Sequence, residues 1–326
     1  MKVEQVEDPV ALKDWQAVAA LCWDHDHVAL PADTLEERLP SLDPALPDGG
    51  ERTEFFLGVV DRRAVGVAEV NFPTVDNLKA ASSRVQVLPD ERRQGFGAAL
   101  LAAVLDRVEA AGRSRVFFEV PSAYPAGVPA AAPLLRSVGA RPVLKEVRRL
   151  LDLTEQPTLD VPVAEGYCVM QWVDEAPDEL VDGLAYLCAR MSTDAPQEEM
   201  EWEPEIWDGA RYREKEAAAM ARGRIRYAAA AVHVASGEVA AMTDIGVSRH
   251  LPEVAYQWDT IVMPEHRGHG LGLAIKTRNH DLLAASSPES RWLNTWNAEV
   301  NTHMIAINQT LGFRPVEYWT EWQLDR

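Results

Sequence analysis

The sequence predicts a mixed α+β fold with two tandem domains, each a mixed, mostly antiparallel sheet flanked by helices. Three observations lead to this prediction. The chain has 326 residues, enough for two domains of ordinary size. One glycine-rich motif occurs twice, and a second short motif follows each copy in the same order. Paired strand-like runs precede the glycines, and alternating helices and strands follow them.

The repeat defines the expected domains. Val87–Gly97 reads VLPDERRQGFG, and Val262–Gly272 reads VMPEHRGHGLG, about 175 positions later. The motif GARPV at 139–143 returns as GFRPV at 312–316 with nearly the same separation. These matches predict a duplicated domain, with copies over residues 1–155 and 165–326. The segment between them contains two prolines and no helical period, as expected for a linker.

Each copy contains its own series of expected elements. In the first copy we expect strands over 54–60, 64–70, 84–88 and 115–120, and helices over 97–110 and 130–138. In the second copy we expect helices over 178–191, 211–222, 271–285 and 301–311, and strands over 227–235, 239–247, 254–263 and 291–296. Gly312 should end the last helix as its C′ residue. Two short strands are expected at the end of each copy.

Charge and composition exclude several classes of protein. The net charge of −19 would repel phosphate backbones, so no nucleic-acid partner is expected, whereas cationic amines would be attracted. No apolar run reaches the ~18 residues of a membrane span, so no membrane partner is expected. The three cysteines are widely spaced, which indicates a reducing, cytoplasmic setting. No metal site is expected, because the adjacent side chains of Asp24–His27 rarely converge on one ion.

Both glycine motifs follow a strand and open a helix, which is a geometry that binds anions. Glycine lets the backbone turn tightly and approach a ligand, and the first helical amides are unpaired at the positive end of the helix dipole. A diphosphate fits such a site. A P-loop is excluded because Gly-Lys-Ser/Thr is missing, and a dinucleotide fingerprint is disfavoured because the third glycine is missing.

The pattern Val-x-Pro-x-x-Arg-x-x-Gly-x-Gly, followed by Asn-x-x-Met and Leu-Gly-Phe, resembles the GNAT family of N-acetyltransferases, in the tandem arrangement of mycothiol synthase. The resemblance is strongest over 257–316. It implies two tandem GNAT folds that bind acetyl-CoA, with the pyrophosphate in the glycine turn. The implied CoA-binding residues of the second copy are Val262, Met263, His266, Arg267, Gly268, His269, Gly270, Leu271, Gly272, Asn301 and Asn308. Those of the first copy are Val87, Arg92, Arg93, Gly95, Gly97 and Ala98.

The second copy is the expected catalytic half, because it keeps more of the family pattern. Asn301 lies at the position where the family begins a helix beside the cofactor, and it serves equally well as a simple helix cap. The first copy has Val128 there, so it is expected to be structural or to bind CoA without turnover. Many family members have a thiolate-protonating tyrosine where this chain has Asn308. Asparagine is no acid, so water or His303 would have to replace it.

Two aspartates are candidates for the catalytic base that removes a proton from the amine. Asp259 lies in an apolar strand three residues before Val262, where an unpaired carboxylate would be costly. It therefore faces either the cleft or a structural partner. Asp244 is on the preceding strand, and the strand period does not decide whether it points to the same face.

Acceptor specificity is expected from the segment 193–207, where five glutamates alternate with two tryptophans. Glu201, Trp202 and Trp207 would hold an amine through charge and aromatic faces, although such charge runs also occur as plain solvated surface. The predicted function is acetyl-CoA-dependent acetyl transfer to a primary amine of a small metabolite or antibiotic, by a monomer or homodimer. The alternatives are mycothiol-synthase-like acyl transfer to a glycosylamine and a non-catalytic CoA-binding or scaffold protein.

Overall fold

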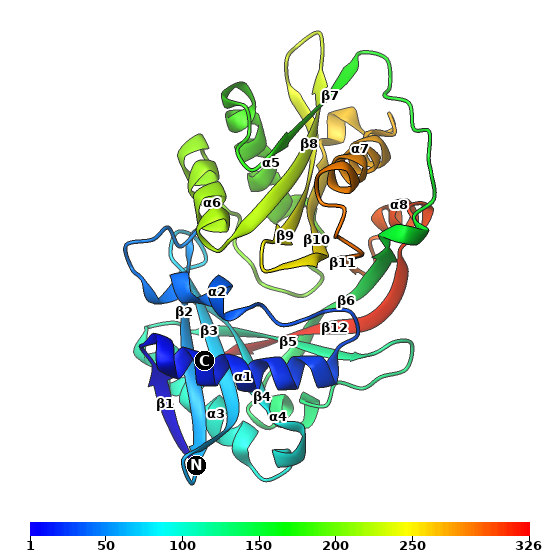
Figure 1. Cartoon of the computed structure of the whole chain (residues 1–326). Helices are drawn as coiled ribbons and strands as arrows, with labels where there is room; N and C mark the ends of the chain where they lie inside the picture. The colour runs from blue at the N-terminus through cyan, green and yellow to red at the C-terminus, as the bar shows by residue number, and fades with distance from the viewer. The chain divides into compact units, whose positions relative to one another are not determined.

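The computed structural model describes all residues, 1–326, and the chain forms two compact units, each with six strands that are neighbours in a sheet (Figure 1). The first unit contains Met1–Glu146, Gln197–Trp202 and Glu317–Arg326. The second contains Val147–Pro196 and Glu203–Val316. The units are therefore not contiguous in the sequence, and the linear boundaries 1–155 and 165–326 stay a prediction about the duplication.

The sheet of the first unit has the strand order β1-β2-β3-β4-β5-β12. Its neighbouring strands are antiparallel except for β4 and β5, which run parallel. The strands are β1 (Lys2–Val6), β2 (Glu51–Val60), β3 (Arg63–Pro73), β4 (Ala80–Val87), β5 (Arg115–Ala123) and β12 (Arg314–Asp325). The mixed, mostly antiparallel sheet predicted for this copy is confirmed.

Helices cover both faces of this sheet. They are α1 (Pro9–Asp26), α2 (Leu35–Arg38), α3 (Phe96–Ala110) and α4 (Ala132–Ser137). Adjacent residues of β2 point to opposite faces, so Phe55 packs with Trp15 of α1, whereas Phe56 packs in the cluster that contains α3. The carboxylate of Asp8 begins α1 by accepting the amides of Val10 and Ala11.

The second unit repeats the arrangement, with the strand order β6-β11-β10-β9-β8-β7 and a parallel pair, β10 and β11. Its strands are β6 (Arg141–Asp152, within this unit from Val147), β7 (Tyr167–Val173), β8 (Arg224–His233), β9 (Val239–Ser248), β10 (Leu251–Val262) and β11 (Trp292–Ala298). Its helices are α5 (Val181–Asp194), α6 (Gly209–Ala221), α7 (Leu271–Ser286) and α8 (Thr302–Thr310).

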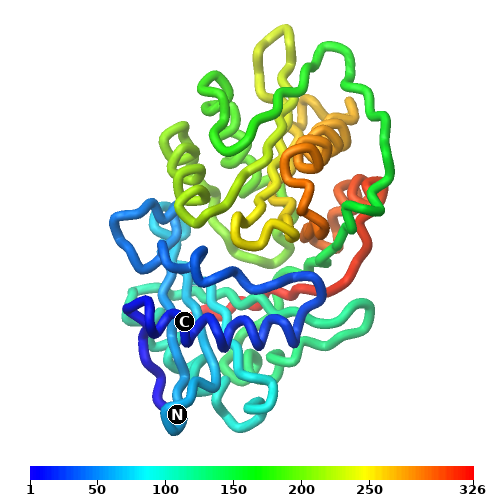
Figure 2. Tube along the Cα trace, viewed as in Figure 1, coloured from blue at the N-terminus to red at the C-terminus, as the bar shows by residue number.

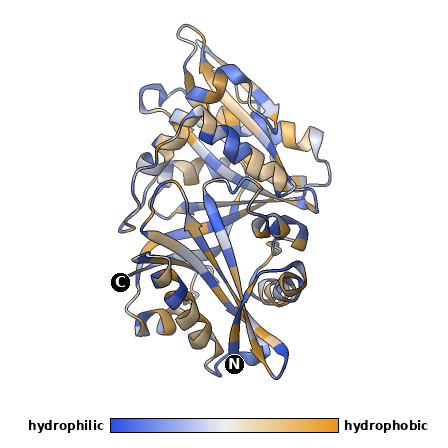
Figure 3. Cartoon of the chain, turned by 90° about the vertical axis from the view of Figure 1, so that its left-hand side faces the viewer, coloured by the Kyte–Doolittle hydropathy of each residue, from blue (hydrophilic) through white to orange (hydrophobic).

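The core of the second unit also has two sides. Alternate alanines of β8 divide between them, with Ala228 and Ala230 packing in the cluster of α5 and α6, and Ala229 and Ala231 in the cluster of α7. The apolar segments of strands and helices are orange in Figure 3. Gly312 follows α8 with a φ of +96°, as predicted for its C′ residue.

Each copy ends in one long strand, which corrects the expected pair of short strands. β6 and β12 each have 12 residues. Neither contains a glycine, and each has its only proline at the second position, so nothing interrupts the extended backbone. Residues Glu317–Asp325 of β12 pair with β5, so the end of the chain completes the sheet formed by its beginning (Figure 2).

Candidate acetyl-transfer site

In each unit, the two parallel strands separate shortly after they begin to pair. β4 and β5 pair at three positions, the last being Ser82 opposite Phe117. β10 and β11 also pair at three positions, the last being Tyr256 opposite Asn294. Beyond these points each strand keeps only its other neighbour, so the carboxyl ends of the pair diverge within the sheet. The glycine turn follows the diverging strand in both units.

The glycine turns leave the N-termini of α3 and α7 open. Gly95 and Gly270 are the cap residues, with φ values of +87° and +69°, and no side chain caps either helix. A Cβ placed on Gly95, Gly268 or Gly270 would meet nothing within 4 Å. The first helical amides therefore face free space at the positive end of the helix dipole, which fits a diphosphate.

The shared geometry of the two turns extends to their arginines, Arg92 and Arg267. Arg92 donates through Nε to the carbonyl of Val87 at 3.0 Å and binds Asp26, the last residue of α1, at 2.7 Å. Arg267 donates to the carbonyl of Val262 at 3.2 Å and to Asp194, the last residue of α5, at 3.3 Å. Each guanidinium thus ties its turn to a helix end.

His266 also faces the protein. Its Nδ1 lies 2.8 Å from the hydroxyl of Tyr167, and its Nε2 lies 3.3 Å from the carboxylate of Glu238. At the matching positions of the first copy, Arg63 pairs with Glu91. The basic and the acidic residue of this contact thus exchange places between the two copies. The ring of His269 lies 5.3 Å from the ring of Tyr167.

The other residues predicted to bind the cofactor pack against the turn or lie within it. The amide of Met263 already donates to Ala240, and its side chain is buried. Leu271 is a core residue. A Cβ on Gly272 would lie 3.2 Å from Ile307 of α8, so glycine allows this close helix contact. The remaining first-copy residues line the same kind of turn: Arg93 has a φ of +65°, and Gly97 and Ala98 lie in the first turn of α3.

Asp244 is paired with a buried arginine. It is buried and binds the buried guanidinium of Arg226 at 3.0 Å. The same guanidinium lies 3.3 Å from the hydroxyl of Tyr212. Burial opposes the charge of Arg226, yet Asp244 and Tyr212 hold its pKa above the usual range. Because its charge is already matched, Asp244 is poorly placed to accept a proton from a substrate.

Asp259 remains accessible. Its carboxylate lies 3.3 Å from Nζ of Lys215, and about a third of each side chain is exposed, 34% and 29%. Burial lowers the pKa of Lys215, but Asp259, Cys188 and Asp244 together outweigh this effect and raise the pKa above its usual range. Nζ of Lys215 also lies 5.5 Å from the ring of Trp207. The structure therefore brings Asp259 and Trp207 into one neighbourhood.

The two asparagines occupy the start and the buried face of α8. The side chain of Asn301 accepts the amide of Met304 at 3.2 Å and so caps the helix. Asn308 is fully buried and donates to Asn297 at 2.7 Å, while its own Oδ1 has no partner. An unpaired buried acceptor is costly, so this atom is available to a donor from outside the chain. His303 is exposed.

The predicted acceptor segment is divided between the units. Glu201 and Trp202 belong to the first unit, where Glu201 binds Arg115 and the Trp202 ring lies 5.7 Å from the ring of Phe117. Trp207 belongs to the second unit and stacks under Arg211. The structure does not bring these three residues together within either unit.

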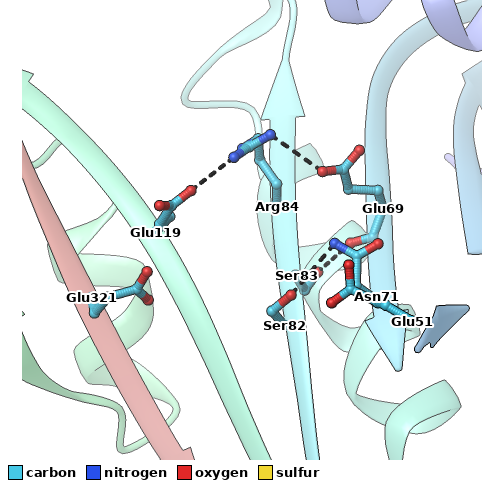
Figure 4. Close-up of a pocket in the computed structure, with 8 residues that line it drawn as sticks. All are labelled: Glu51, Glu69, Asn71, Ser82, Ser83, Arg84, Glu119 and Glu321. Carbon is cyan, nitrogen blue, oxygen red and sulfur yellow. Dashed lines mark hydrogen bonds and ion pairs between the residues drawn. The ribbon is translucent and has the colours of Figure 1, made fainter. Parts of the chain in front are cut away.

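Sequence reasoning missed a polar cavity in the first unit. It has a volume of about 260 Å³ (Figure 4). Its lining residues are Glu51, Glu69, Asn71, Ser82, Ser83, Arg84, Glu119 and Glu321. The repeat in the sequence could have indicated this cavity, because Arg84 and Glu69 of the first copy occupy the positions that correspond to Asp259 and Asp244 of the second.

Known proteins support the assignment that this geometry suggests. Residues 15–128 match the acetyltransferase (GNAT) family. A tandem GNAT protein from the clavulanic acid biosynthesis pathway, solved without AcCoA, is 27% identical, with a TM-score of 0.82 over 99% of this chain and 98% of that chain. A GCN5-related N-acetyltransferase from Sphaerobacter thermophilus is 17% identical, with a TM-score of 0.70 over 99% and 95% of the two chains. No curated protein matches the chain.

The fold and its two glycine turns define an acyltransferase built from two tandem folds of one kind. Residues 15–128 match the GNAT family of acetyltransferases, and the whole chain is similar to a tandem GNAT protein, which confirms the resemblance seen in the sequence. The family match covers the first copy, although the motifs are more complete in the second. No helix has the length and apolar composition needed to cross a membrane.

Proposed function

We propose that the chain is an acetyl-CoA-dependent N-acetyltransferase acting on the primary amine of a small metabolite or antibiotic. The observation that carries this proposal is the pair of uncapped, unfilled helix N-termini, each at the end of a diverging parallel strand pair. A small-molecule acceptor is supported by the similar tandem GNAT protein, which belongs to a biosynthetic pathway. Three free cysteines favour a cytoplasmic setting.

In the second unit, this chain's residues would bind the nucleotide and prepare the amine. The amides that follow Gly270 would hold the pyrophosphate, with Arg267 fixing the turn. Bound acetyl-CoA would supply the acetyl group as a thioester. Transfer of the acetyl group to the amine would release the free thiol and one proton. Asp259 is the accessible carboxylate beside the diverging strands, and it would accept that proton.

Binding without turnover is the second candidate for this half. Asn308 stands at the position of the family's thiolate-protonating tyrosine and carries no acidic proton, so the thiol would have to take its proton from water. A CoA-binding role would need the glycine turn and would not need Asp259. Turnover and binding must therefore be measured separately.

The test is CoA binding by calorimetry together with thiol release across a panel of primary amines. Gly270→Glu should weaken CoA binding by more than about tenfold, because a carboxylate would stand where phosphate lies. Gly95→Glu tests the first unit in the same way. Gly237→Glu is the matched control, since Gly237 also has a positive φ, +75°, with nothing within 4 Å, but lies in a hairpin turn.

The outcomes separate the candidates. Thiol release that depends on an amine supports the acetyltransferase. Tight CoA binding with no release for any amine would replace it by the binding role. Unchanged CoA affinity in both the Gly95→Glu and Gly270→Glu proteins would overturn the assignment of the turns.

A further inference from the structure

The cavity of the first unit lies where β4 and β5 separate. Ser82 is the last residue of β4 that pairs with β5, and Ser83 and Arg84 follow it into the cavity wall. On the far side of the opening, Glu119 of β5 and Glu321 of β12 line the same cavity. The cavity is therefore in the first unit's own diverging strand pair, upstream of its own glycine turn at Gly95.

The register places two carboxylates directly opposite each other. Glu321 and Glu119 are cross-strand partners in the antiparallel pairing of β12 with β5. Like charges in directly opposed positions destabilise a sheet. On the other side, Glu69 and Arg84 are also cross-strand partners, and there the charges are opposite. The Glu119–Glu321 pair thus costs stability that an apolar or mixed pair would not.

The cavity lining contains four glutamates and one arginine. Arg84 is the only cation in the lining, and it bonds to Glu69 at 3.2 Å and to Glu119 at 2.8 Å. Arg38 binds Glu69 as well. Glu321 makes no hydrogen bond or ion pair, and its carboxyl group is directed into the cavity (Figure 4).

Burial changes the protonation of two carboxyl groups in this region. Burial raises the pKa of Glu321 well above its usual range, and the neighbouring Glu119 and Glu146 raise it further. Burial, together with Glu119 and Glu198, raises the pKa of Glu146 to about 7. A cation in the cavity would supply a positive charge beside these carboxyl groups and would favour their ionised form over the protonated form.

We infer that this cavity binds the ammonium group of a small primary amine, which gives the first half of the chain an acceptor site of its own. An ammonium group has three donors, and the cavity offers carboxylates and the hydroxyl of Ser82 as acceptors. No group of three ligating side chains in the chain suits a metal ion. The volume, about 260 Å³, fits a short alkyl chain.

The inference deepens the proposed function and rests on it only for the transfer step. In that step the amine nitrogen forms a bond to the acetyl carbon, and the bond from that carbon to sulfur breaks. Before the attack the bound ammonium loses one proton to the carboxylate of Glu321, and the second proton, which the nitrogen loses as the amide forms, passes through water to the departing thiolate. The first half would then be catalytic, instead of structural as its sequence suggests.

The test is calorimetric titration of the full chain with n-butylamine and 1,4-diaminobutane, using butanol and butyrate as probes without a positive charge. The amines should bind, and the uncharged and anionic probes should not. Glu321→Gln should weaken amine binding by at least tenfold. Asp106→Asn removes the same charge from an exposed position of α3 and should leave binding unchanged.

Binding of the wild-type protein should also tighten as the pH rises from about 5 to 8, because the proton on Glu321 must leave before the amine binds. This measurement needs no variant, so it stands if Glu321→Gln does not fold. Equal binding of butanol and butylamine, or equal amine affinity in the folded Glu321→Gln and Asp106→Asn proteins, would overturn the inference.

Thiol release distinguishes this inference from the proposed function. Amine binding that requires Glu321, without any thiol release, would leave the cavity site standing and remove the proposed function. Thiol release with amines that is insensitive to Glu321→Gln would keep the proposed function and remove the cavity site. It would place acetyl transfer in the second unit.

Discussion

At the scale of single residues, the same residue type has different roles according to its partner. Asp244 and Asp259 lie on neighbouring strands of one sheet, and the sequence nominates both as bases. The structure gives Asp244 a buried guanidinium at 3.0 Å and gives Asp259 a partly exposed ammonium at 3.3 Å. The sequence pattern cannot make this distinction, because Arg226 and Lys215 come from separate elements, β8 and α6.

Substitution of the two aspartates should therefore have different effects, one on stability and the other on activity. Asp244→Asn removes the closer of the two buried carboxylates that pair with Arg226, the other being Glu216, and should lower the free energy of unfolding by about 3 kcal/mol. Asp259→Asn should change stability by less than about 1 kcal/mol and reduce amine-dependent thiol release about 100-fold or more. Denaturant unfolding and steady-state rates measure both effects. Equal rates in wild-type and Asp259→Asn protein would remove Asp259 from the mechanism.

At the scale of elements, the glycine turns and the helices that follow them could be predicted from local sequence, because φ and capping depend on the residues at the turn itself. α3 and α7 begin at Phe96 and Leu271, each within one residue of the expected start. The helix α1 was missed, although Leu12, Trp15, Ala19 and Cys22 follow the helical period and are buried. Glu321 could not be found this way, since its partner Glu119 is distant in the chain.

The buried face of α7 gives a prediction at this scale. Lys276 is 1% exposed and makes no hydrogen bond or ion pair, and burial lowers its pKa to about 7 from 10.5. The unfolded chain thus binds more protons than the native chain between these pH values, so Lys276 makes stability rise with pH over that window. Lys276→Met should raise the free energy of unfolding at pH 7 by several kcal/mol and remove this dependence.

Urea unfolding of both proteins from pH 7 to 10 tests this prediction. The difference in the free energy of unfolding between the two proteins should shrink steadily as the pH rises. Folding must remove the proton from Lys276, and this cost disappears when the lysine of the unfolded chain is also neutral. A constant difference across the range would show that the lysine is charged in the native helix, and that packing alone explains the effect.

At the scale of the whole molecule, the duplication could be predicted from two short motifs, and the mixed fold followed from it. The membership of the terminal strands could not be predicted, because pairing partners far apart in sequence leave no local signal. Residues Glu317–Asp325 lie at the end of the second copy, yet they pair with Arg115–Ala123 of the first. A folding unit here depends on the end of the chain as well as on its beginning.

Removal of residues 317–326 should therefore destabilise the first unit. The deletion removes Trp322 and Leu324 from the core cluster that contains α3, and it leaves the backbone groups of β5 without their partner strand. Amide hydrogen exchange should show lost protection in β4, β5 and α3, with the protection of β8, β9 and α7 kept. Trp322→Ala in the full chain should reproduce part of this loss. Equal loss of protection in β8 and β9 would mean that both units unfold as a single cooperative structure. Unchanged protection in β5 would mean that its pairing with β12 contributes nothing to the stability of the first unit.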